Sequence, residues 1–283
     1  WTAGAHLDIV VAPEFLRQYS MCGDPADRSC YEIAVLQEPE GRGGSQLMHR
    51  IFEPGRRVFV SKPINHFELE PSAKLSLLFG GGIGVTPMLA FAHELHRKGG
   101  RFRLMYSASQ KSKAAFDGAF DGLAWADRVS RHYSDQGTRL DIARDVPAYD
   151  AGTHIYVCGP DAYMSAILDH ARSIGYPEAA LHAEFFTVPE LPEWENHPFE
   201  IERANGQKIP VTATQSASDA LIAAGIPVDV KCADGLCGVC KCTVLSGEVE
   251  HRDFVLSAAQ RETTVILCQS RAAEAGGVLK LDI

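Results

Sequence analysis

Four cysteines near the end of the chain place the strongest constraint on what it can fold into. Cys232, Cys237 and Cys240 follow the spacing C-x4-C-x2-C, and Cys268 comes after 27 further residues. This is the spacing of a plant-type [2Fe–2S] site, which is held by four thiolates. A tight loop would supply three of these thiolates, and a separate element would deliver the fourth. The spacing therefore predicts an iron–sulfur domain in this part of the chain.

Two glycines inside the loop, Gly235 and Gly238, favour the same interpretation, because small residues let backbone N–H groups approach the cluster sulfurs. A structural zinc site is one alternative, but zinc sites favour a C-x2-C pair on both sides, and here only Cys237 and Cys240 form such a pair. Buried, inert thiols are the other alternative. We expect Cys242, two residues beyond the third ligand, to be a packed bystander.

Length and charge narrow the class of protein that carries this motif. A chain of 283 residues is long enough for two or three domains. A net charge of −9 without a basic run argues against a nucleic-acid surface. No apolar run approaches the roughly 18 residues that a membrane span needs. Four of the eight cysteines belong to the motif and no signal peptide precedes them, so we expect a reducing, cytoplasmic setting.

The first part of the chain, residues 1–71, reads as a small β-barrel. Apolar alternation predicts strands at 5–11, 17–21, 31–36, 58–60 and 65–69. Between them, Gly41-Arg-Gly-Gly-Ser45 leads into a predicted helix at 46–52, with Ser45 near its N-cap. A glycine-rich turn that opens a helix suits a phosphate, although a plain turn is the alternative.

The second part, residues 72–186, alternates between strands and helices. The predicted strands are 74–79, 101–106, 129–133, 154–158 and 180–186, and the predicted helices are 87–97, 112–124 and 161–174. This alternation predicts a parallel sheet with helices on both faces and ligands at the carboxyl ends of its strands.

A glycine loop, Gly80-Gly-Gly82-Ile-Gly84, follows the first strand of this part. We expect Thr86 to be the N-cap of the next helix and Pro87 its first residue. Pro87 replaces the third glycine of the usual dinucleotide fingerprint, so the loop predicts a related nucleotide cradle rather than a standard Rossmann site. The segment Cys158-Gly159-Pro160 lies at another strand end.

Three prolines and a lack of periodicity predict a linker at residues 187–198. Beyond it, the turn Asn205-Gly206 predicts a hairpin between strands at 199–203 and 209–212. A helix is expected at 218–224. Further strands are expected at 243–245 and at 265–267, the second of which would deliver Cys268.

Six features follow one another along the chain: Arg17-x-Tyr19-Ser20, Gly41-x-Gly-Gly-Ser45, Gly81-Gly-Ile-Gly-Val-Thr-Pro87, Cys158-Gly-Pro160, His182-x-Glu-x-Phe186 and the four cysteines. In this order they resemble the phthalate dioxygenase reductase family, a branch of the ferredoxin–NADP reductase-like flavoproteins. The similarity covers essentially the whole chain, including Glu250-His-Arg-Asp253. It implies a flavin-binding antiparallel β-barrel at 1–71, a parallel-sheet α/β NAD-binding domain at 72–186 and a C-terminal β-grasp [2Fe–2S] ferredoxin domain at 199–283. The family's barrel has further strands before the position of Trp1, so we expect residues upstream of this sequence.

The resemblance implies FMN rather than FAD. It places Arg17, Gly44 and Ser45 on the FMN phosphate, Tyr19 and Ser20 along the isoalloxazine with Ser20 near N5, and Phe186 stacked on the ring. An arginine suits a phosphate and an aromatic side chain suits a planar ring. From the residues alone, Arg17 as a solvated surface charge and Phe186 as a core aromatic stay open.

The resemblance also implies a nicotinamide dinucleotide at the strand ends. Its pyrophosphate would lie on Gly82, Gly84, Thr86 and Pro87, and its nicotinamide beside Cys158, Gly159 and Pro160. The reacting centre would then hold Ser20, Cys158 and Phe186, although Cys158 could equally be a small core residue. The stretch 107–113 lacks an arginine for a 2′-phosphate, which favours NADH. Lys111 and Lys113 keep NADPH open.

Together these features predict an NADH-dependent reductase that passes electrons from FMN to the [2Fe–2S] cluster and on to a partner protein. In this family the partner is the terminal Rieske oxygenase of a bacterial aromatic catabolic system. A diiron monooxygenase, a general ferredoxin-type role and a passive electron carrier with a decayed flavin domain are the alternatives. From residue 193 onward the chain has 13 acidic and 8 basic residues, which predicts an acidic docking face, with a role in solubility alone as the alternative.

Overall fold

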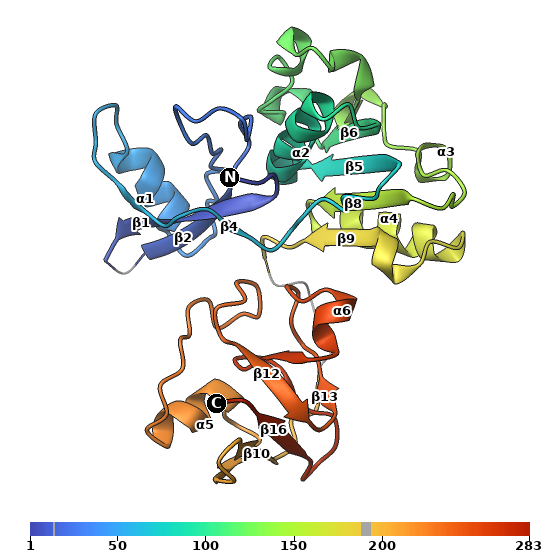
Figure 1. The fold of residues 1–283 in the computed structure, drawn as a ribbon. Coiled ribbons are helices and arrows are strands. Elements are labelled where there is room, and N and C mark those ends of the chain that lie inside the picture. The colour runs from blue at the N-terminus through green and yellow to red at the C-terminus, as the bar shows by residue number, and fades with distance from the viewer. Residues whose placement is uncertain (14, 188–193) are drawn as a thin grey trace. The chain divides into compact units, whose positions relative to one another are not determined.

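The computed structural model describes residues 1–13, 15–187 and 194–283, in two compact units, Trp1–Glu184 and Phe185–Ile283 (Figure 1). Half of the predicted linker, residues 188–193, lies outside the described residues. Among the helices that the structure does describe, we find none with the length and apolar character that crossing a bilayer requires.

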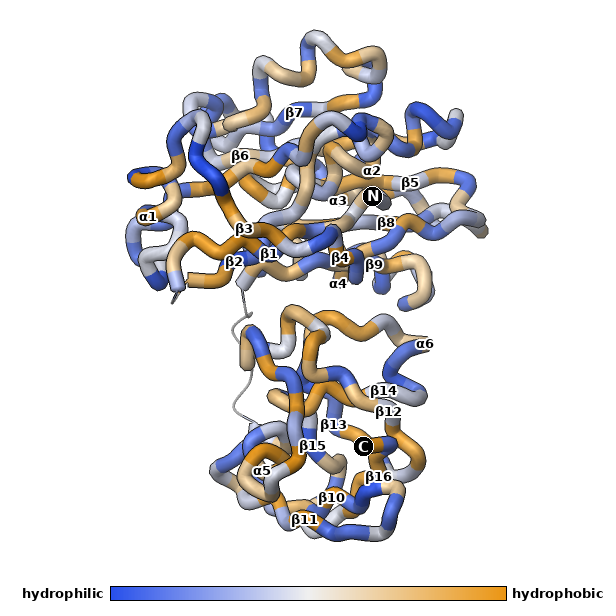
Figure 2. Tube along the Cα trace, turned by 60° about the vertical axis from the view of Figure 1, so that its left-hand side comes forward, coloured by the Kyte–Doolittle hydropathy of each residue, from blue (hydrophilic) through white to orange (hydrophobic). Residues whose placement is uncertain are grey.

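The first unit begins with an antiparallel sheet around β1 (Ala5–Ala12). This strand pairs with β2 (Phe15–Ser20), β3 (Phe59–Val60) and β4 (Ile64–Asn65), so the strands predicted near 5–11 and 17–21 are confirmed. Alternate residues of β1 face inward and pack with Met48 of α1 (Gly44–Ile51). At the other edge, Figure 2 shows β3 as hydrophobic, although Phe59 is 79% exposed.

Three expectations for this sheet are wrong in detail. In the described part of residues 31–36 we find only a single bridge, between Met21 and Ile33, because Tyr31 and Leu36 are more than half exposed and bury no strand face. The strands near 58–60 and 65–69 are shorter than predicted and shifted. Helix α1 starts directly after Gly43, whose φ of 82° forms the turn, so Ser45 is the second helical residue and not the N-cap.

The same unit contains a parallel sheet of five strands in the order β7-β6-β5-β8-β9. Its members are β5 (Leu75–Gly81), β6 (Phe102–Ala108), β7 (Val129–Tyr133), β8 (Thr153–Cys158) and β9 (Leu181–Glu184). The chain leaves β5 toward β6 but leaves β8 toward β9, in the opposite direction. Right-handed crossovers therefore put α2 (Val85–Arg97) and α4 (Asp161–Ser173) on opposite faces (Figure 1). The predicted doubly covered sheet is confirmed, and its switch point lies between β5 and β8.

Three local predictions in this sheet region are wrong. Residues 112–124 form short 3-10 turns at Lys111–Lys113 and Phe120–Gly122 rather than a helix, since two glycines interrupt the stretch. A 3-10 turn at Gly82–Gly84 runs straight into α2, so Thr86 lies inside the helix and Pro87 is its third residue, not its first. The Thr86 hydroxyl donates to the Ile83 carbonyl at 3.0 Å. Strand β9 ends at Glu184, two residues earlier than predicted.

The second unit is a mixed sheet in the order β11-β10-β16-β12-β14, packed against α5 (Ala217–Ala223). Its strands are β10 (Phe199–Arg203), β11 (Lys208–Val211), β12 (Lys241–Ser246), β14 (Thr264–Ile266) and β16 (Val278–Leu281). A small pair of β13 (Val249–Glu250) and β15 (Arg271–Ala272) and the short helices α3 (Ile142–Asp145, first unit) and α6 (Ala258–Arg261) complete the elements. The predicted hairpin, helix and cysteine-delivering strand are confirmed.

Candidate functional site

The first turn of α1 meets the side chain of Arg17 from β2. A Cβ atom added at Gly44 would lie 2.4 Å from Arg17 Nε, so only glycine lets the guanidinium lie against this turn. No acidic residue or capping side chain occupies the turn, while Ser45 Oγ accepts the N–H of Glu38 at 3.1 Å. Free N–H groups beside a guanidinium attract an anion. Arg17, Gly44 and Ser45 therefore fit the phosphate of a flavin nucleotide.

Strand β2 sends its other two candidate residues to opposite faces of the sheet. Tyr19 lies opposite Leu7 and shares its face with Arg17, whereas Ser20 lies opposite His6 on the other face. Burial raises the pKa of the Tyr19 hydroxyl, so it stays a neutral donor. The Ser20 side chain is buried. The strand thus offers a guanidinium and a phenol on one side and a buried hydroxyl on the other.

We expect Gly44→Val to weaken flavin binding at least tenfold, about 1.4 kcal/mol, because its side chain would displace the Arg17 guanidinium from the helix start. The measurement is the flavin content of the purified protein and its flavin dissociation constant. Gly118→Val is the matched control, since a Cβ there meets no atom within 4 Å. Equal flavin affinity in the two variants would contradict the phosphate assignment.

A second cluster of candidate residues lies where β5 and β8 end, at the switch point of the sheet. Gly80 pairs with Cys158, and Cys158 pairs with Glu184, so three neighbouring strands end together. A Cβ atom at Gly84 would lie 2.4 Å from the carbonyl carbon and oxygen of Cys158. The glycine loop therefore packs directly on the Cys158-Gly159-Pro160 segment, and both predicted nucleotide motifs meet at one place.

The loop reaches this position through backbone that favours glycine. Gly82 has a φ of 56°, in the left-handed region. Pro87 is the third residue of α2, where the missing N–H is not needed for an intrahelical bond. The first turn of α2 has no acidic residue and no side-chain cap. Its N–H groups and the loop fit a pyrophosphate at the crevice between β5 and β8.

Ser20 and Glu184 connect the barrel to the parallel sheet. The Ser20 hydroxyl donates to Glu184 Oε2 at 3.0 Å. Burial raises the pKa of Glu184 to about 7. Burial, with Glu184 nearby, also raises the pKa of the Cys158 thiol well above its usual value, so this thiol stays neutral. A carboxyl group that changes protonation near pH 7 thus lies between a hydroxyl and a neutral thiol.

The raised pKa of Glu184 gives a signed prediction for stability. Between pH 4.5 and 7 the folded state holds a proton that the unfolded state has lost, so stability falls as the pH rises through this window. Between pH 4.5 and 8 the unfolding free energy of the wild type should fall by about 1–3 kcal/mol more than that of the Glu184→Gln variant. Urea unfolding at the two pH values measures this. Glu178→Gln is the control, because Arg172 lowers the pKa of that carboxyl. A pH-independent difference would contradict the assignment.

Phe186 follows β9 and belongs to the second unit, where it is 40% exposed. Its neighbour Phe185 packs against Phe254 with ring centroids 5.2 Å apart. Stacking of Phe186 on a flavin ring stays a prediction.

The four motif cysteines gather in the second unit. The Cys232 thiol is hydrogen-bonded to those of Cys237 and Cys268, and Cys240 is hydrogen-bonded to Cys268. Three of the four are buried, and Cys232 is half-buried. Cys242 instead directs its thiol to the carbonyls of Thr243 and Asp282. Loop and strand therefore bring together the predicted four thiols and leave Cys242 apart.

Backbone N–H groups surround these sulfurs. The N–H of Asp234 donates to Cys232 Sγ at 3.3 Å, and the N–H of Leu236 donates to the same sulfur. The N–H of Val239 donates to Cys237, and that of Gly235 donates to Cys268. The loop takes this shape through left-handed backbone at Ala233, Gly235 and Gly238. Four thiols with inward N–H donors are a donor set that fits a [2Fe–2S] cluster.

Two features of the site carried no clear signal in the sequence. Glu184 stood inside the His182-x-Glu-x-Phe186 motif without an assigned role, because one acidic residue near a strand end has no diagnostic spacing. The Tyr163 ring packs against the glycine loop, 2.9 Å from where a Cβ of Gly81 would lie. Only the fold brings α4 to that loop, so the spacing could not reveal it.

Comparisons with known proteins agree with this geometry. Residues 200–273 match the family described as "2Fe-2S iron-sulfur cluster binding domain". The chain is 40% identical to the vanillate O-demethylase oxidoreductase of Pseudomonas sp. (strain HR199 / DSM 7063), over 99% of this chain and 90% of that one.

Solved structures also match the whole chain. One is phthalate dioxygenase reductase, described as a modular structure for electron transfer from pyridine nucleotides to [2Fe–2S], with 34% identity, a TM-score of 0.68 and 88% of that chain covered. Another is a type IV self-sufficient cytochrome P450 monooxygenase, with 36% identity and a TM-score of 0.91, of which this chain matches 37%. The chain belongs to the phthalate dioxygenase reductase family: it is a flavin- and nicotinamide-dependent [2Fe–2S] oxidoreductase, the reductase component of an oxygenase or demethylase system.

Proposed function

We propose that this reductase accepts a hydride from NADH on FMN and delivers single electrons through its cluster to a Rieske-type terminal oxygenase. The main support is the meeting of Ser20, Glu184 and Cys158 with the glycine loop at the ends of β5 and β8. This arrangement within one compact unit supports a nucleotide crevice beside the proposed flavin-side strand β2.

Each group of candidate residues has a role in this proposal. Residues 1–71 bind FMN through Arg17, Gly44 and Ser45 at the phosphate and through Tyr19 and Ser20 at the ring, and Phe186, at the end of the range 72–186, stacks on that ring. Residues 72–186 bind the dinucleotide through Gly82, Gly84, Thr86, Pro87, Cys158, Gly159 and Pro160. Residues 199–283 hold the iron through Cys232, Cys237, Cys240 and Cys268, and residues 187–198 join the parts.

When bound, the flavin supplies the exchange between a two-electron hydride and single electrons. The chain's residues position and protect this chemistry. The Ser20 hydroxyl, held by Glu184, presents its oxygen at the edge of the ring site. Glu184 can hold or release a proton at Oε2 near neutral pH. The buried, neutral Cys158 fills the strand end and excludes water, so the two rings can approach without an intervening charge.

The preference for NADH is supported by the charges beyond β6. Lys111 Nζ lies 3.7 Å from Asp117, and Arg131 pairs with both Asp117 and Asp121. Lys111 and Arg131 are therefore paired with carboxylates, which would repel the 2′-phosphate of NADPH. Lys113, exposed on its 3-10 turn, is the remaining cation that a 2′-phosphate could use.

The visible spectrum of the purified protein, before and after anaerobic NADH, tests the proposal. We expect overlapping flavin and [2Fe–2S] absorbance that bleaches much faster with NADH than with NADPH, and stoichiometric FMN released on denaturation. Cluster absorbance without flavin or a response to NADH would contradict the reductase function. Faster bleaching with NADPH would reverse only the nucleotide preference.

A haem monooxygenase is the second candidate acceptor, because the P450 relative carries a region like this chain within a longer protein. NADH-driven turnover of a purified Rieske oxygenase, compared with that of a purified P450 under the same conditions, separates the two. We further infer that the protein works in the bacterial cytoplasm, since its relatives include a Pseudomonas enzyme and its motif cysteines require a reducing setting.

A further inference from the structure

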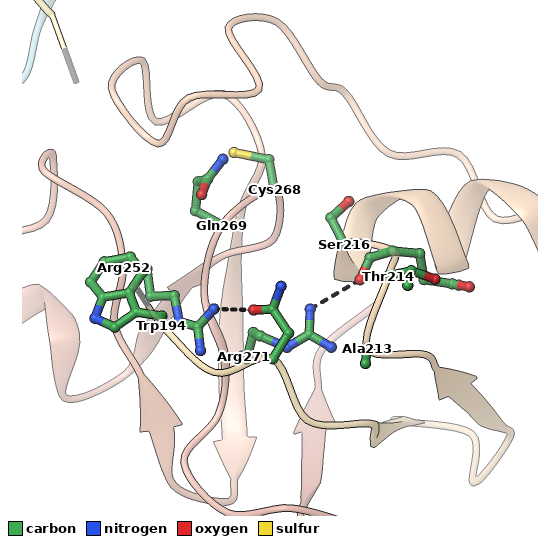
Figure 3. Close-up of a pocket in the computed structure, with 10 residues that line it drawn as sticks. Trp194, Ala213, Thr214, Ser216, Arg252, Cys268, Gln269 and Arg271 are labelled. Atoms are coloured by element: carbon green, nitrogen blue, oxygen red, sulfur yellow. Dashed lines mark hydrogen bonds between the residues drawn. The ribbon is translucent and has the colours of Figure 1, made fainter. Parts of the chain in front are cut away.

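A pocket of about 370 Å³ in the second unit lies beside the last cluster cysteine. Cys268 lines it together with Trp194, Thr214, Arg252 and Arg271 (Figure 3). Figure 3 shows the cysteine above the two guanidinium groups. Both arginines are only 5% exposed, so two cations are buried next to a ligand of the cluster. Buried arginines need partners, and the two arginines differ in the partners that they have.

Arg252 is neutralised within the pocket wall. Its Nε donates to Glu250 Oε2 at 2.9 Å, and a second N–H donates to the same carboxylate. Asn196 accepts a further hydrogen bond, and the Trp194 ring stacks on the guanidinium at 4.9 Å. This arginine and Glu250 therefore form a pair with little net charge.

Arg271 has hydrogen bonds but no carboxylate partner. It donates to the carbonyls of Thr212 at 2.8 Å, Gln215 at 3.0 Å and His197 at 2.8 Å. Its Nε is buried without a hydrogen-bond partner, and within the described ranges no carboxylate lies at salt-bridge distance from it. Burial and the charge of Arg252 lower the pKa of Arg271, whereas the charge of Glu250 raises it. The pocket therefore keeps one net positive charge.

We propose that the positive charge of Arg271 raises the reduction potential of the [2Fe–2S] cluster that Cys268 helps to hold. Reduction adds one negative charge to the cluster, and a cation in a poorly solvated wall of the same pocket stabilises that form more than the oxidised one. Arg271 included, the chain from residue 193 onward has 13 acidic and 8 basic residues, and this net negative charge has the opposite effect on the potential. Arg271 is thus a positive charge within a net negative unit, in the wall of the same pocket as the cluster ligand Cys268. This inference rests on the proposed function.

The test is spectroelectrochemical titration of the cluster in the full-length, cofactor-loaded protein. We expect Arg271→Gln to lower the midpoint potential by about 59 mV, a tenfold shift in the one-electron equilibrium. Arg271→Lys, which keeps the charge, should restore most of this loss. Lys280→Gln is the control, because it removes a cation of the same unit whose side chain is 39% exposed. At 0.5 M salt, which screens exposed charges, this variant should leave the midpoint potential unchanged.

A second pair of variants keeps the test valid if Arg271→Gln does not fold, because Arg271 also holds three carbonyls. Thr214 is exposed at the rim of the pocket, so Thr214→Glu should fold and lower the potential, while Thr214→Gln should not. An unchanged or raised potential in both Arg271→Gln and Thr214→Glu, or equal shifts for the Gln and Lys variants, would overturn the inference. A wild type without cluster absorbance would overturn the proposed function, and this inference with it.

Discussion

Cys268→Ala should abolish electron delivery from NADH to the acceptor protein, by at least about a thousandfold, while reduction of the flavin by NADH continues. Cys268 follows β14 and is the only one of the four thiols that comes from outside the loop. Its thiol is hydrogen-bonded to those of Cys232 and Cys240, so its loss opens one side of the thiolate set. The remaining three thiolates cannot complete the coordination of both irons.

Visible absorbance and the electron paramagnetic resonance of the dithionite-reduced protein measure the cluster, and ferricyanide reduction by NADH measures the flavin step. The matched control is Cys242→Ala, which removes a half-buried thiol in the same unit that faces only backbone carbonyls. This control should keep the cluster signal and electron delivery. Loss of the cluster in Cys242→Ala, or its retention in Cys268→Ala, would show that the ligand assignment is wrong.

Some parts of the fold could be predicted from the sequence. In these parts a short residue pattern indicates either a buried surface or a fixed ligand geometry. The spacing of Cys232, Cys237 and Cys240 reflects bonds to one group, so it survives any change in the surrounding fold. Apolar runs such as 154–158 are buried on both faces, and the structure confirms them as strands of a parallel sheet. The loops at Gly84 and Cys158 could be placed because they follow such strands.

The failures come from residues whose state is set by tertiary neighbours. Residues 31–36 alternate like a strand, but Tyr31 and Leu36 bury no face, and the described residues there form only one bridge. In the stretch 112–124, the burial of Phe120 and the glycines two residues to either side of it, Gly118 and Gly122, outweigh local helix propensity. Glu184 and the buried Arg271 depend on contacts between distant segments. No spacing in the sequence encodes those contacts.

Gly84→Ala should raise the KM for NADH at least tenfold and slow reduction of the flavin, while flavin and cluster content stay normal. A Cβ atom at this position would lie 2.4 Å from the carbonyl carbon and oxygen of Cys158 and 2.6 Å from the Gly159 nitrogen. These are backbone atoms, which cannot rotate away, so the loop or the end of β8 must move. The glycine loop and the end of β8 together form the proposed dinucleotide crevice. The overpacking should also reduce unfolding stability by about 1–3 kcal/mol.

Stopped-flow reduction of the flavin at increasing NADH concentrations separates weaker binding from a slower hydride step. Gly122→Ala is the matched control, because a Cβ there meets no atom within 4 Å and the residue lies in an outer 3-10 turn. If the crevice between β5 and β8 binds the dinucleotide, only Gly84→Ala changes the NADH dependence, although both variants fold. If Gly84→Ala loses stability but keeps its KM, the close contact serves packing alone and the nucleotide binds elsewhere. Because the contact joins the glycine loop to the Cys158 segment, this one methyl group tests both predicted nucleotide motifs together.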